Sequence, residues 1–134
     1  MISRSPRRCS PGLRSPGRWV QALAGLHLAT GVILYRRQVT DIAADGVVAT
    51  VPDWGDRATA FWFLAGAPLL WTSGRLLRSA EANGDARAQC VGGAALAATG
   101  AVGAAAMPVS GFWAVAALGT WSWVQGRRAP RCHT

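Results

Sequence analysis

Residues 88–107 read AQCVGGAALAATGAVGAAAM, a run of 20 residues that carries no formal charge. A helix of about 20 apolar residues crosses the roughly 30 Å hydrocarbon core of a bilayer. Three further charge-free runs of 16 or 17 residues occupy 19–35, 58–74 and 109–124. None of the four runs has the polar stripe that a helix of a soluble bundle turns to water. The sequence therefore predicts an all-α integral membrane four-helix bundle rather than a soluble bundle.

The composition agrees with a membrane protein. Of the 134 residues, 51% are hydrophobic and 15% are charged, yet the net charge is +8 and all 14 cations are arginine. A positive net charge is typical of proteins that bind nucleic acid. Here the arginines lie between the apolar runs instead of forming one patch, so we expect no nucleic acid and take the lipid bilayer as the partner.

The two ends of the chain differ from the four runs. Residues 1–18 hold three Pro, two Gly, four Ser and five Arg, and they predict a disordered tail. Residues 125–134 predict a basic C-terminal tail. The run at 19–35 is followed directly by Arg36 and Arg37 without a small-residue cleavage site, which favours an uncleaved helix over a signal peptide.

The distribution of arginine predicts the orientation. Residues 1–18, 75–87 and 125–134 together hold eleven arginines against two acids, when 75–87 is taken as a loop. The opposite loops hold three arginines and four acids. Because short cytoplasmic loops are enriched in Arg and Lys, we expect both termini in the cytoplasm and a multi-pass location in the cell membrane.

The loop between the first two runs carries its own pattern. Val39, Ile42, Ala43 and Val47 follow the spacing of an apolar helical stripe. We expect a short interfacial helix at 38–46 in the outer headgroup region. The alternative is an irregular loop.

The 88–107 run also carries a row of small residues at every fourth position. The row is Gly93, Ala97, Ala101 and Ala105, and Gly100 with Ala104 forms a shorter one. Small residues let helix backbones approach closely in lipid. We therefore place this helix in the centre of the bundle, or at the interface with a second copy or a membrane protein partner.

His27 is the one ionisable residue well inside any run. Such residues are costly in lipid, and a proton relay, ligand contact or metal ligand are the functional alternatives. The structural alternative is a neutral imidazole hydrogen-bonded to Gln21, Thr30, Thr99 or a backbone carbonyl. His27, Thr30 and Thr99 form the candidate intramembrane polar site.

We find no catalytic, cofactor-binding or metal-binding motif in the sequence, and we expect a protein that is not an enzyme and binds no cofactor. Cys132 and His133 are two adjacent residues, whereas a zinc site normally needs about four ligands at set spacings. A non-catalytic accessory or scaffold component of the membrane is the first expectation. A small homo-oligomeric transporter or channel is the alternative, and a membrane enzyme or redox subunit with His27 as ligand comes third.

Three segments carry a resemblance to a known family. They are GLHLATGVILYRR at 25–37, DIAADGVVATVPDWGDRATAFWF at 41–63 and MPVSGFW at 107–113. Their arrangement resembles an uncharacterised family of small four-helix integral membrane proteins from high-GC bacteria. The resemblance covers about residues 19–124; it implies the same four-span topology and supplies no mechanism. The arginine-rich 1–18 segment departs from the family pattern.

Overall fold

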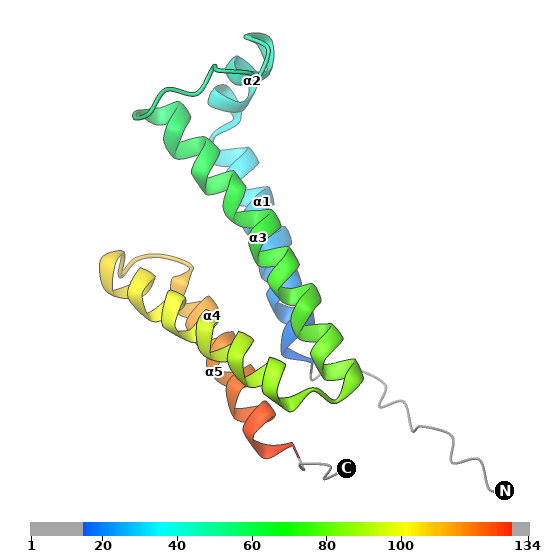
Figure 1. The fold of residues 1–134 in the computed structure, drawn as a ribbon. Coiled ribbons are helices and arrows are strands. Elements are labelled where there is room, and N and C mark those ends of the chain that lie inside the picture. The colour runs from blue at the N-terminus through cyan, green and yellow to red at the C-terminus, as the bar shows by residue number, and fades with distance from the viewer. Residues whose placement is uncertain (1–14, 130–134) are drawn as a thin grey trace, which may run out of the picture. The chain divides into compact units, whose positions relative to one another are not determined.

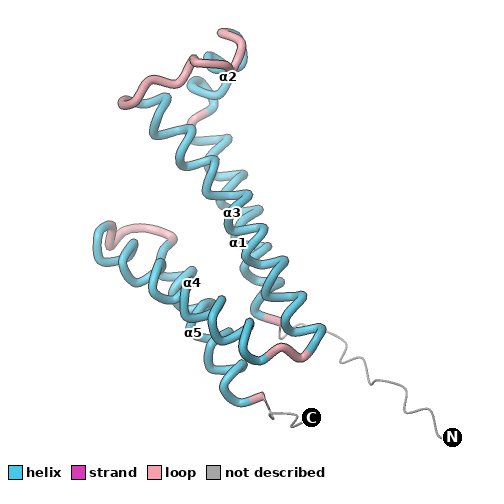
Figure 2. Tube along the Cα trace, viewed as in Figure 1, coloured by secondary structure: helices cyan, strands magenta, loops and turns pink. Residues whose placement is uncertain are grey.

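The computed structural model describes residues 15–129. Over these residues the chain forms helices joined by loops, without a strand (Figures 1 and 2). The five helices are α1 (Pro16–Leu34), α2 (Arg36–Ala44), α3 (Asp56–Asn83), α4 (Ala86–Ala106) and α5 (Phe112–Arg128). The fold divides into two compact units, and each is described by itself. Of the described residues, unit 1 holds 15–19 and 74–129, and unit 2 holds 20–73.

In unit 2, α1 and the first part of α3 lie side by side and run antiparallel (Figure 1). Two glycines mark their closest approach. Gly31 faces the side chains of Phe63 and Leu64, and Gly66 faces His27. A Cβ at position 31 would lie 2.7 Å from Leu64 Cδ2, so the Leu64 side chain would have to shift to admit a larger residue.

The connection between α1 and α3 contains α2, and the single residue Tyr35 separates α2 from α1. The sequence predicts a helix here, and α2 starts and ends two residues earlier than the expected 38–46. An ion pair of 2.7 Å between Arg57 and Asp45 joins the start of α3 to the residue that follows α2. Arg57 also donates to the Thr50 carbonyl at 3.4 Å. Arg57 therefore connects the start of α3 to the first residue of the loop and to its middle.

In unit 1, α3 continues to Asn83, through most of the 75–87 segment that the sequence predicts as a loop. The difference has a local cause, because Arg, Leu, Ala and Glu are all good helix formers and no breaker precedes Gly84. Gly84 adopts a φ of +68° and ends the helix. Its N–H donates to the Glu81 carbonyl, and the Asp85 N–H donates to the Ala80 carbonyl, which is the Schellman pattern. Asp85 then caps α4 by accepting from the Ala88 N–H at 2.9 Å.

Helices α4 and α5 form the second antiparallel pair, and their backbones are in direct contact. The buried positions of α5 are Val115, Gly119, Ser122 and Gly126, which repeat at intervals of four and three residues. Such spacing is that of a left-handed coiled-coil seam. A Cβ added at Gly119 would lie 2.8 Å from the Gly93 carbonyl oxygen. The main chains of α4 and α5 therefore pack directly against each other at Gly119 and Gly93.

The face that α4 uses corrects one expectation. Gly93, Gly100 and Ala104 are buried, whereas Ala101 and Ala105 are exposed. A strict four-residue row drifts around a straight helix, while a coiled-coil seam alternates steps of four and three. The contact of α4 with α5 therefore follows the coiled-coil seam, and Ala101 and Ala105 of the predicted row lie outside it.

Two helix ends also lie beyond the expected runs. The predicted disordered tail extends through Arg18, but Ser15, Pro16 and Gly17 are buried and α1 begins at Pro16. Residues 1–14 lie outside the described part of the chain. At the other end, α5 starts at Phe112, after a turn in which the Ser110 hydroxyl donates to the Met107 carbonyl at 2.6 Å, and continues to Arg128. The expected tail at 125–134 is thus helical as far as Arg128, and 130–134 are not described.

One helix of residues 15–129 is both long and apolar enough to cross a membrane by length and composition. It is α4, with a mean hydropathy of 1.3 over its best window. That window is 22% buried. One such helix is weak evidence for a membrane protein when taken alone.

Candidate functional sites

The predicted site residue His27 lies on α1 in unit 2 and is half-buried. Its Nε2 is 2.9 Å from the carbonyl oxygen of Phe63 on α3. Because a carbonyl can only accept, Nε2 carries the proton and donates. The imidazole also stacks on the Phe63 ring, with 4.1 Å between centroids and 18° between planes. Of the hydrogen-bond partners that the sequence analysis considers for His27, the structure shows the backbone carbonyl.

The sequence of α3 makes room for this contact. A Cβ at Gly66 would lie 3.3 Å from His27 Nε2, closer than an ordinary contact, so the glycine lets the imidazole approach. Tyr35 packs its ring 5.4 Å from that of Phe63. We call His27, Tyr35 and Phe63 the His27 cluster.

The two predicted threonines lie in different units. Thr30 lies on α1 and is exposed, and Thr99 lies on α4 in unit 1 and is also exposed. The cluster thus offers one imidazole donor whose known partner is a main-chain carbonyl. Its geometry is that of a hydrogen bond that joins two helices.

Glu81 makes the contact that sequence reasoning missed. Its carboxylate accepts a hydrogen bond from the Ser15 hydroxyl and another, at 3.0 Å, from the Gly17 N–H. A negative charge at the first N–H groups of a helix is favourable because of the helix dipole. Ser15 followed by Pro16 is a helix-start signal that was present in the sequence. No local sequence pattern indicated that Glu81 would be the carboxylate at this helix start.

The α4–α5 pair buries several polar groups near one end. Gln89 Nε2 donates to Gln125 Oε1 at 3.4 Å, and the Cys90 thiol donates to the Trp123 carbonyl at 3.7 Å. The Ser122 side chain is fully buried in the same interface. The two hydrogen bonds join one helix to the other, whereas the buried Ser122 Oγ has no hydrogen-bond partner among the described residues. The thiol is held against a carbonyl instead of a base that would activate it.

Groups of three or more His, Cys, Asp or Glu that would hold a metal ion do not occur within residues 15–129. Cys132 and His133 lie outside the described residues. The candidate sites of the described residues therefore consist of hydrogen bonds between helices. They connect α1 with α3 in unit 2, and α4 with α5 in unit 1.

Comparison with known proteins adds one finding. A family model matches residues 13–129, and its description is a family of unknown function, DUF6463. The chain belongs to that family. No curated protein and no solved structure matches the chain. Membership in DUF6463 agrees with the resemblance to an uncharacterised family and carries no activity.

Proposed function

We propose that this DUF6463 protein is an integral membrane protein that crosses the bilayer four times and acts as a non-catalytic accessory or scaffold component. The observation that carries the proposal is the distribution of side-chain size. The buried hydrophobic residues are mainly alanine, namely Val20, Ala24, Ala58, Ala60, Ala67, Leu77, Ala80, Ala104 and Val115. Large apolar side chains lie outside on all four long helices, including Leu26, Ile33, Trp62, Leu69, Leu76, Val91, Val102 and Trp113.

This arrangement is the reverse of a water-soluble core. Soluble domains bury Leu, Ile, Val and Phe and rarely expose large contiguous apolar patches. In lipid, helices associate through small residues and present their large apolar side chains to the acyl chains. The distribution therefore supports a lipid environment for α1, α3 and α5 as well as α4.

Helix lengths fit this reading when the charged ends are considered. At 28 residues, α3 is about 42 Å long, so its arginine-bearing last turns extend beyond a core of about 30 Å. At 17 residues, α5 is about 25 Å long, and the flexible side chains of Arg127 and Arg128 at its end can reach the interface. With the cationic segments in the cytoplasm, both termini are cytoplasmic and α2 lies in the outer headgroup region.

The accessory role is supported by how polar groups within the helices are used. His27 donates to the Phe63 carbonyl, and Gln89 donates to Gln125. Hydrogen bonds of this kind stabilise a helical scaffold. The alternative is a homo-oligomeric transporter or channel. It is favoured by the exposed small residues Ala94, Ala98, Ala101 and Ala105 of α4, which give a second copy a face for close packing.

Membrane fractionation followed by partner identification tests the proposal. The full chain should stay in the membrane pellet after alkaline carbonate extraction and be released by detergent. Release by carbonate alone contradicts membrane insertion. After cross-linking in the native membrane, a reproducible different protein supports the accessory role. Cross-links to other copies of this chain alone favour the transporter or channel.

A further inference from the structure

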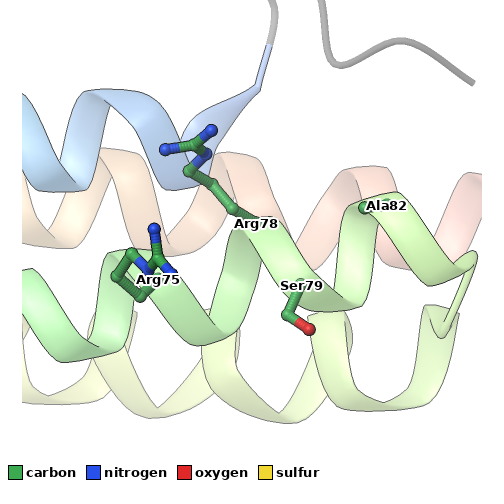
Figure 3. A pocket seen from close by; sticks show the side chains of 4 residues that line it. All are labelled: Arg75, Arg78, Ser79 and Ala82. Carbon is green, nitrogen blue, oxygen red and sulfur yellow. The ribbon is translucent and has the colours of Figure 1, made fainter.

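A shallow pocket of about 210 Å³ lies on the last part of α3 and is lined by Arg75, Arg78, Ser79 and Ala82. These positions fall on one face of a helix, because residues three and four apart are neighbours. Both guanidinium groups extend to the same side of α3 (Figure 3). Ser79 and Ala82 are small, so the space beside the arginines stays open.

The acidic residues nearest in sequence are held by helix starts. Glu81 accepts from the Gly17 N–H at the start of α1, and Asp85 accepts from the Ala88 N–H at the start of α4. Their negative charge is thereby directed at the positive ends of helix dipoles. Arg75 is exposed beside the pocket. Arg78 is half-buried, and its side chain lies against Gly17 at the start of α1. The exposed guanidinium of Arg75 therefore presents the positive charge of the pocket to an incoming ligand.

The arginine side chain selects the class of ligand. Its planar guanidinium donates several hydrogen bonds in a fixed fork that matches the oxygens of phosphate or carboxylate. The place along α3 favours phosphate. The charge-free run 58–74 ends one residue before Arg75, and the next residue, Leu76, is 67% exposed. In the proposed topology this is the level of the inner headgroups, where phospholipid phosphate is abundant.

We propose that Arg75 and Arg78 form a phosphate-binding site at the inner membrane surface. The inference rests on the proposed function. At this level the phosphate comes either from the headgroup of an anionic phospholipid or from a soluble phosphate of the cytoplasm. The chemistry of the two arginines is the same for both sources, and the source is decided by experiment.

The test is isothermal titration of the purified full chain in detergent micelles, once with phosphatidylglycerol and once with inorganic phosphate. The double variant Arg75→Gln/Arg78→Gln should weaken binding at least about tenfold, since the loss of even one hydrogen bond between a guanidinium and a phosphate costs about tenfold. The control Arg127→Gln/Arg128→Gln removes the same charge from the same proposed side and should bind within about twofold of the unsubstituted chain. Arginine-dependent binding of phosphatidylglycerol alone assigns the site to lipid. Equal arginine-dependent binding of inorganic phosphate assigns it to soluble phosphate.

Two results overturn the proposal: neither probe binds, or both double variants weaken binding alike, as unspecific charge attraction would. The variant Arg75→Lys/Arg78→Lys keeps the charge and loses the fork, so it should bind several-fold more weakly even if the glutamine variant fails to fold. Binding unchanged in the lysine variant also counts against a guanidinium site. Carbonate extraction of the unsubstituted chain separates the two proposals. Retention in the membrane without arginine-dependent binding refutes only the phosphate site.

Discussion

The contact between α4 and α5 makes the sharpest prediction, through Gly119→Ala. An added Cβ would lie 2.7 Å from the Leu96 carbonyl carbon and 2.8 Å from the Gly93 oxygen, both main-chain atoms of α4. Optimal carbon contacts are about 3.5–4.0 Å, so the helices must separate by about 0.8 Å. A gap of that size loses about a quarter to a half of each dispersion contact along the seam. Overpacking of this kind costs about 1–3 kcal/mol.

The matched control is Gly25→Ala, at a helical glycine of α1 where a Cβ meets nothing within 4 Å. Both substitutions gain the same helix propensity, about 1 kcal/mol, so their difference isolates the packing cost. We expect the free energy of unfolding of Gly119→Ala to lie about 2 kcal/mol below that of Gly25→Ala. Denaturation by sodium dodecyl sulfate, followed by circular dichroism in mixed micelles, measures it. A difference under about 0.5 kcal/mol would refute a main-chain contact between α4 and α5.

Three smaller predictions concern single contacts. His27→Leu removes the donor to the Phe63 carbonyl and should lower the free energy of unfolding by about 0.5–1.5 kcal/mol in the same assay, whereas no change would show that the hydrogen bond is not formed. Asp85→Ala removes the cap of α4 and should cost about 0.5–2 kcal/mol, with faster amide exchange in the first turn of α4; unchanged exchange there would argue against the cap. Arg57→Ala breaks a partly exposed ion pair with Asp45 and should change stability by at most about 1 kcal/mol, so a loss above about 2 kcal/mol would mean that the loop depends on this pair.

The sequence predicted the helices well because their signals are local. Each of the four charge-free runs falls largely within one helix, and the stripe through Val39 and Ile42 falls on α2. Helix ends were harder. The predicted loop at 75–87 relied on its charged residues, yet charged residues such as Arg and Glu are good helix formers and let α3 continue to Asn83. Gly84, with its positive φ, is the signal that places the end correctly.

The candidate site was predictable only in part. His27 was singled out by its place in an apolar run, but its partner lies 36 residues away and is a main-chain atom. No side-chain pattern reports a main-chain acceptor. The hydrogen bond from the Gly17 N–H to the Glu81 carboxylate joins residues that are 64 positions apart. It was missed because its donor is also a main-chain group. Parts of both predicted rows lie on the seam of α4. Gly93 and Ala97 of the longer row and Gly100 and Ala104 of the shorter row lie there, whereas Ala101 and Ala105 are exposed.

Topology mapping tests the central proposal, four crossings with both ends inside, most directly. Single cysteines are introduced by Val48→Cys, Asn83→Cys and Val109→Cys in a chain whose native cysteines are replaced by alanine. All three positions are exposed; 48 and 109 lie in loops, and 83 is the last residue of α3. A membrane-impermeant maleimide added to intact cells should label positions 48 and 109. Position 83 should react only after the cells are permeabilised. Labelling of position 83 in intact cells, or opposite results at 48 and 109, would contradict four crossings with cytoplasmic termini.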